Sequence, residues 1–93
     1  MIIEHHVFRL APGVDEADFL AADEAVQQRF VPFQEGFIRR TTARDGDRWL
    51  VETFWYSAQL ATAARDSDHP AVVALAACVD EATERIDRFE TLD

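Results

Sequence analysis

The sequence predicts a ferredoxin-like α+β fold, in which a four-stranded antiparallel sheet carries its helices on one face. The predicted elements follow the order β-α-β-β-α-β, and the Asp45-Gly46 pair marks a tight hairpin between the two middle strands. The third strand is apolar on both sides, which predicts that two copies pack together sheet to sheet as a homodimer. A chain of 93 residues is the size of one domain, so residues 1–93 are assigned to one.

The N-terminal part of the chain predicts a strand followed by a helix. Residues 2–10 are rich in β-branched and aromatic side chains, and the strand stops at an Ala-Pro-Gly sequence. Asp15 is a suitable N-cap for the helix, and Pro32 ends it. Between them, apolar residues recur at helical spacing and form one stripe: Phe19, Ala22, Val26 and Phe30.

The central hairpin predicts the dimer. Residues 36–43 and 48–56 form its strands, and 44–47 form the turn. One face of the third strand carries Trp49, Val51, Thr53 and Trp55, and the other carries Leu50, Glu52, Phe54 and Tyr56. Two helices cover only one face of a sheet, and an uncovered aromatic face would be a large adhesive patch. A second copy packed sheet to sheet would bury it.

The C-terminal part predicts an interrupted helix and a last strand. Ser57 caps a short helix that runs through Arg65, and residues 68–70 begin a second helical segment. The apolar side of that segment consists of Val72, Leu75, Ala76 and Val79. His69 is interpreted as a capping and turn residue, with gating of a pocket as the alternative. Residues 83–92 form the fourth strand.

The composition excludes several classes of partner. The chain is 48% hydrophobic and its net charge is −9, with arginine as the only cationic residue besides histidine. Phosphate backbones and anionic membranes would repel such a chain, so neither nucleic acid nor a membrane is an expected partner. No segment is apolar for long enough to span a bilayer. The single Cys78 excludes an internal disulfide and a cysteine-rich metal site. We expect the protein in the cytoplasm.

Three segments resemble a known group of proteins. The segment "FWYS…RDSDHP" (54–70) is similar to the W-x-S segment and following Ser-x-His/Phe turn of antibiotic-biosynthesis-monooxygenase-like proteins, which belong to the dimeric α/β-barrel superfamily. "QEGF" (34–37) resembles the Pro-Gly-Phe sequence that opens their second strand. The opening "MIIEHHVFRLAPG" (1–13) is also similar to two sister branches, the NIPSNAP proteins and the stress-responsive barrel proteins.

The resemblance implies a pocket between the sheet and the helices of each subunit. Some members of the superfamily oxidise aromatic polyketides without a cofactor, and others bind and degrade haem. Trp55 matches the pocket tryptophan of the W-x-S segment, and His6 falls where haem-degrading members keep a catalytic asparagine. Val51 stands where quinone-forming members have an asparagine, and the histidine that holds haem iron would fall near 64–65, where this chain has alanine and arginine. We therefore expect no cofactor.

The two adjacent histidines are the main candidates for chemistry. His5 and His6 follow one another on a strand, so they point to opposite faces and cannot share a metal ion. We expect one to face the pocket and the other the dimer side. A histidine in a semi-apolar cavity can act as a base, since its ordinary pKa is about 6.5. His6 is the candidate catalytic residue, and a hydrogen-bonded core residue is the alternative.

The remaining candidates would bind a ligand or stabilise the dimer. Trp55 and Trp49 are aromatic walls for a ligand or core residues. Glu52 is a lone charge on an apolar strand face, and we expect it to pair with Arg39 or Arg40, either at a dimer interface or in a ligand site. His5 and His69 complete the set of candidate ligand-binding residues. An arginine would anchor an oxyanion.

Two functions follow from these residues. The first is a homodimer that binds a small aromatic or apolar metabolite and oxidises it without a cofactor. The alternative is a non-catalytic dimeric barrel with a stress-response or regulatory role, whose pocket is filled by its own side chains. A cavity near the ~300 Å³ that ligand sites need, beside Trp55, would favour the first.

Overall fold

A computed structural model describes residues 1–92. Its four strands form one antiparallel sheet in the order β2-β3-β1-β4, and the predicted ferredoxin-like fold is confirmed. The strands are β1 (Ile2–Phe8), β2 (Phe37–Asp45), β3 (Arg48–Trp55) and β4 (Arg85–Glu90). The helices are α1 (Glu16–Arg29), α2 (Ala58–Arg65) and α3 (Pro70–Ala77), with short 3₁₀ turns η1 (Val31–Phe33) and η2 (Glu81–Thr83).

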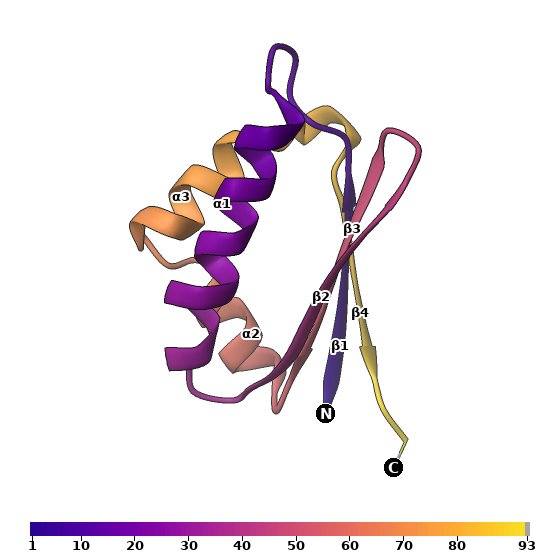
Figure 1. Cartoon of the computed structure of the whole chain (residues 1–93). Coiled ribbons are helices and arrows are strands. Elements are labelled where there is room, and N and C mark those ends of the chain that lie inside the picture. Colours follow the sequence, from indigo (N-terminus) through magenta and orange to yellow (C-terminus); the bar gives the residue numbers. More distant parts are fainter. Residues whose placement is uncertain (93) are drawn as a thin grey trace.

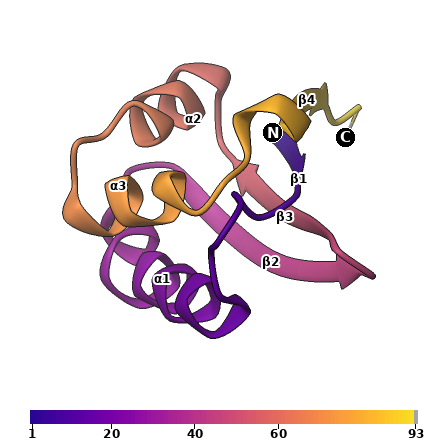
Figure 2. The same cartoon turned by 90° about the horizontal axis from the view of Figure 1, so that it is seen from above.

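The helices α1, α2 and α3 all lie against the same face of the sheet, as predicted (Figures 1 and 2). The opposite face is bare in the single chain. Within residues 1–92, no helix is long and apolar enough to cross a membrane.

The helix starts predicted from the sequence are confirmed by their caps. The Asp15 carboxylate accepts a hydrogen bond from the Ala17 backbone N–H at 3.1 Å, and the Ser57 hydroxyl accepts one from the Leu60 N–H at 3.3 Å. His69 Nδ1 accepts a hydrogen bond from the N–H of Ala71 at 3.1 Å. His69 is therefore a capping residue.

The hairpin and one further turn depend on glycine. Gly46 has a φ of 63°, which the tight turn after Asp45 requires. Gly36 has a φ of 80°, and a side chain there would also collide with Leu60 of α2. Gly36 therefore lets α2 pack closely against the chain where it turns into β2.

Two predicted strands are shorter in the structure by two residues or more, and the third strand by one. The first ends at Phe8, and Leu10 forms only an isolated bridge with Val79. The fourth begins at Arg85 because residues 81–83 form the turn η2, whose start is capped by the Asp80 carboxylate. At the end of β1 and at the start of β4, the chain crosses between the sheet and the helical layer.

The alternation of side chains along β1 and β3 separates an inner face from an outer face. The inner face meets the helices and forms two clusters of buried side chains. One surrounds Trp55 with Val26, Phe30, Val31, Ala61, Ala64 and Ala71; the other surrounds Phe19 with Phe8, Trp49, Val51, Cys78 and Val79. The outer face carries Ile3, Val7, Leu50, Phe54 and Phe89, with His5 and Glu52 among them.

Candidate functional site

A cavity of about 290 Å³ lies between the sheet and the helices. Its wall is mostly apolar and includes Phe8, Val26, Val51, Trp55, Val72 and Leu75. The polar groups at its surface are Glu4, His6, Arg40, Thr53, Arg65, Glu81 and Glu84. The volume lies close to the lower limit of ligand sites, which begins at about 300 Å³, and corresponds to a small ligand.

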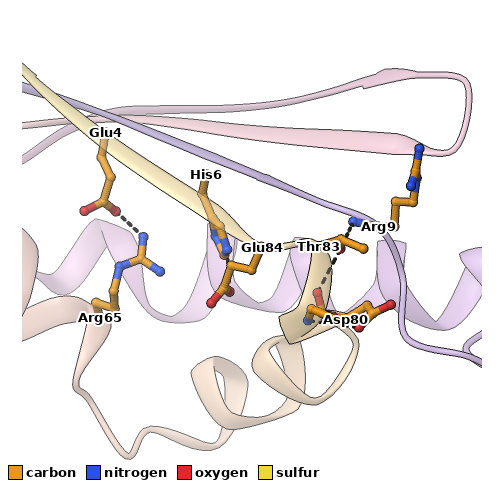
Figure 3. A network of polar contacts seen from close by, with 8 residues as sticks. Glu4, His6, Arg9, Arg65, Asp80, Thr83 and Glu84 are labelled. Carbon is orange, nitrogen blue, oxygen red and sulfur yellow. Dashed lines mark hydrogen bonds and ion pairs between the residues drawn. The ribbon is translucent and has the colours of Figure 1, made fainter.

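His6 reaches this cavity from the middle of β1, on the inner face as one of the two histidines was expected to do. Its side chain is 12% exposed, and Nε2 lies 2.7 Å from the carboxylate of Glu84, just before β4 (Figure 3). Burial lowers the pKa of His6, and the Arg65 guanidinium lowers it further, while the hydrogen bond to Glu84 opposes both. The imidazole is therefore neutral at neutral pH.

The contact with Glu84 determines which nitrogen of His6 carries the proton. An ionised carboxylate only accepts hydrogen bonds, so Nε2 is the protonated nitrogen and donates to it. A neutral imidazole then has its lone pair on Nδ1, which has no hydrogen-bond partner among residues 1–92. A neutral histidine held by a carboxylate, with its second nitrogen free, has the arrangement of a general base.

Glu4 lies two residues before His6 on the same face of β1 and is buried, with 4% of its surface exposed. Arg65, the last residue of α2, donates from Nη2 to one carboxylate oxygen (Figure 3), and Arg88 of β4 donates from Nε to the other at 2.9 Å. Arg88 also donates to the Thr62 hydroxyl at 2.8 Å. This network compensates the buried charge and ties α2 to the sheet beside the cavity.

Substitution of Glu4 by alanine is expected to lower the free energy of unfolding by about 2–3 kcal/mol, because two arginines lose their shared partner. The estimate lies at the low end for buried pairs because about a third of each arginine side chain is exposed. Urea titration followed by circular dichroism measures it. Glu90→Ala, at an exposed position of the neighbouring strand, is the control and should change stability by less than about 0.5 kcal/mol. Equal effects of the two changes would contradict the network.

Trp55 lies at the cavity end of β3 and is 4% exposed. The edge of its ring meets Phe37 at a centroid distance of 5.7 Å. Its indole Nε1–H is buried and has no hydrogen-bond partner within residues 1–92. An unpaired buried donor is costly, and an acceptor on a ligand would remove that cost.

The predicted pairing of Glu52 with Arg39 or Arg40 is wrong within the single chain, where Glu52 contacts a histidine instead. The strand register sets Glu52 opposite His5 of β1, and the Glu52 carboxylate lies 2.6 Å from His5 Nε2 on the outer face. Arg40 points to the inner face, where it binds Asp23 of α1 at 2.6 Å. Strand alternation therefore separates Arg40 from Glu52.

The other predicted ligand-binding residues are distributed over the fold. Arg39 lies on the outer face over the ring of Phe54, 5.9 Å from its centroid. Trp49 packs against Phe19 in the second buried cluster, at a centroid distance of 4.7 Å. Of the candidates named from the sequence, the cavity wall includes His6, Trp55 and Arg40; it does not include His5, Arg39, Trp49, Glu52 or His69.

Four charged residues of the site were not among the candidates: Glu4, Arg65, Glu81 and Glu84. The signal for Glu4 was present, since residues two apart on a strand share a face and Glu4 therefore accompanies His6. Arg65 and Glu84 come from a helix end and a turn, whose positions relative to β1 depend on the tertiary fold. Among residues 1–92, no group of three or more histidine, cysteine or acidic side chains is arranged to hold a metal ion.

Solved structures with the same fold were found by comparison. SnoaB, a cofactor-independent oxygenase from Streptomyces nogalater, matches with a TM-score of 0.79 and 18% identity over 99% of this chain and 93% of its own. A proposed antibiotic biosynthesis monooxygenase from Bordetella bronchiseptica matches with a TM-score of 0.80 and 18% identity over 98% and 96%. The chain has the fold of antibiotic-biosynthesis-monooxygenase-like proteins.

A third solved structure has the same fold at lower sequence identity. A proposed antibiotic biosynthesis monooxygenase from Caulobacter crescentus has a TM-score of 0.80 and 12% identity over 99% of this chain and 90% of its own. No family model matches the chain, and no curated protein matches it. The resemblance stated from the "FWYS" segment is thus confirmed at the level of the fold.

Proposed function

We propose that this protein is a homodimer that binds a small aromatic metabolite in the cavity and oxidises it with molecular oxygen, without a cofactor. The observation that carries the proposal is the neutral His6, held by Glu84 at 2.7 Å with Nδ1 free, in an apolar cavity of about 290 Å³. The fold shared with SnoaB, which is described as a cofactor-independent oxygenase, supports the same reaction class.

The chemistry begins with a proton transfer. Nδ1 of His6 accepts a proton from an acidic C–H or O–H of the ligand, and the electron pair stays on the ligand as an anion. An electron-rich anion can react with oxygen directly. For an anthrone, one oxygen atom replaces the two hydrogens of the ring CH₂ as a ketone, and the other leaves as water. The substrate supplies all the electrons, so no external reductant is needed.

The bare outer face of the sheet supports the dimer. Five apolar side chains on three strands would otherwise stay partly or largely exposed to water: Ile3, Val7, Leu50, Phe54 and Phe89. A second copy packed against this face would bury them. The cavity opens on the other side of the sheet, so each subunit would keep its own site.

The test is a substitution that fills the cavity and leaves its polar groups unchanged. Ala76 and Ala77 are exposed neighbours at the end of α3, and only Ala76 lines the cavity. Ala76→Phe is expected to reduce ligand binding and oxygen uptake by about tenfold or more, since a bulky side chain fills space a ligand needs. Ala77→Phe is the matched control and should behave as wild type.

Phenols, anthrones and quinols are offered under air, with an oxygen electrode to follow turnover and calorimetry to follow binding. Uptake above background by wild type, lost in Ala76→Phe, supports the proposal. Background uptake with intact binding would refute oxidation. If no compound binds, the non-catalytic barrel is the better description.

A further inference from the structure

Of the two arginines of the cavity wall, Arg65 is the one that has a buried N–H donor without a partner within residues 1–92. Arg40, the other arginine of the wall, is 4% exposed in its side chain and binds Asp23 and Gln27. Arg65 binds Glu4 from Nη2, but its Nε–H is buried and has no partner within residues 1–92. A guanidinium has five N–H donors, so Arg65 can keep Glu4 and still bind another acceptor.

A second unpaired donor lies in the same cavity. Trp55 is 4% exposed, and its Nε1–H is buried without a partner. Both Trp55 and Arg65 line the cavity, and the buried group without a hydrogen bond is a donor in each. Such groups are satisfied by acceptor oxygens on a ligand.

Arg65 also lies near His6. The guanidinium and the imidazole project into the same space below β1 (Figure 3), and the charge of Arg65 lowers the pKa of His6. When His6 removes a proton from the ligand, a negative charge remains on the ligand. A positive charge with a free N–H at the same cavity would stabilise that anion.

We propose that Arg65 binds the ionised oxygen of the ligand, so that the cavity holds a phenol or enol as its anion. This inference rests on the proposed function, since it names the chemical class that the same site takes. Glu4 fixes the orientation of Arg65 through Nη2, which leaves the Nε–H for the ligand, and Arg88 also binds Glu4 and shares in compensating its charge. The charged groups around the bound anion are Glu4, Arg40, Arg65, Glu81, Glu84 and Arg88.

The test measures ionisation of a bound phenol and needs no turnover. The probe is 4-nitrophenol, whose anion absorbs visible light while the neutral form does not. Bound to wild type, it should titrate about one pH unit or more below its value in water, as for an acid beside an opposite charge. Nonspecific attraction of the anion would not explain this, because the chain carries a net charge of −9.

Arg65→Gln should raise the pKa of the bound probe to its value in water or above. Arg29→Gln is the matched control: Arg29 is the last residue of α1 as Arg65 is of α2, but it is exposed and not part of the cavity wall. It should leave the titration as in wild type. A bound probe that titrates at its ordinary value in wild type, or equally in wild type and Arg65→Gln, would overturn the inference.

A second measurement on wild type covers the case in which Arg65→Gln does not fold. The methyl ether 4-nitroanisole cannot ionise, so its affinity should stay constant with pH. The affinity of 4-nitrophenol should rise as pH passes through its own pKa. Parallel pH dependences for the two compounds would refute anion binding. Absence of oxygen uptake would refute only oxidation, because neither experiment depends on it.

Discussion

Replacement of His6 by alanine is expected to lower oxygen uptake by about 10²–10⁴-fold, the usual contribution of a positioned general base. The loss follows from the free Nδ1 lone pair of the neutral imidazole, which the alanine side chain lacks. His5→Ala is the matched control, because His5 is the adjacent residue on the opposite face of the sheet. Its uptake should stay within about twofold of wild type, since it does not contact the cavity.

The pH dependence separates catalysis by His6 from a structural role. Only neutral His6 accepts a proton, so uptake should fall as pH decreases through the pKa of His6. Burial and Arg65 lower that pKa, so the fall should lie below the ordinary pKa of histidine. Glu84→Gln removes the contact that raises the pKa, so the fall should move to still lower pH while the maximal rate also decreases. A fall at or above the ordinary histidine pKa would contradict the assignment.

The same lowered pKa predicts the direction of acid destabilisation. Unfolded His6 binds a proton at higher pH than folded His6, so stability increases with pH between the two values. The contribution of neutral His6 is complete above the unfolded pKa and is lost as pH falls toward the folded one. His6→Ala should therefore flatten this part of a stability–pH curve.

Local patterns in the sequence predicted most of the fold. Asp15, Ser57 and His69 cap helices because each side chain reaches a backbone N–H only two or three residues away. The turn at Gly46 is equally local. Strand alternation placed His5 and His6 on opposite faces, and only the choice of which faces inward required the structure. These features depend on neighbours in the chain, and the sequence therefore contains enough information to infer them.

The composition of the site was less predictable because its polar groups meet across the fold. Glu84 reaches His6 from the other end of the chain only because β4 pairs with β1. The partner of Glu52 depended in the same way on the register of β1 against β3, which sets His5 opposite it. A sequence gives the strand faces, but it does not give the register of nonadjacent strands. Predictions of ion pairs are therefore weaker than predictions of caps.

The second large effect is expected at the outer face of the sheet, where we predict that two subunits associate. Phe54 of β3 lies opposite Ile3 of β1, and Ile3 lies opposite Phe89 of β4, so these residues form an apolar row across three strands. Val7 and Leu50 form a second pair on the same face. Phe54 lies on the central strand β3, with Arg39 of β2 over its ring. Buried aromatic residues contribute most of the binding energy at protein interfaces.

Wild type is expected to be a dimer at micromolar concentration, and Phe54→Glu to weaken it at least about 30-fold, the equivalent of about 2 kcal/mol or more. The new carboxylate would lose its water on association, with Glu52 on the same face adding repulsion. Phe33→Glu is the control: Phe33 is 77% exposed in η1, outside the sheet face, so the dimer should persist. Sedimentation velocity over a concentration series measures both. A monomeric wild type, or a Phe54→Glu dimer as tight as wild type, would refute association through this face.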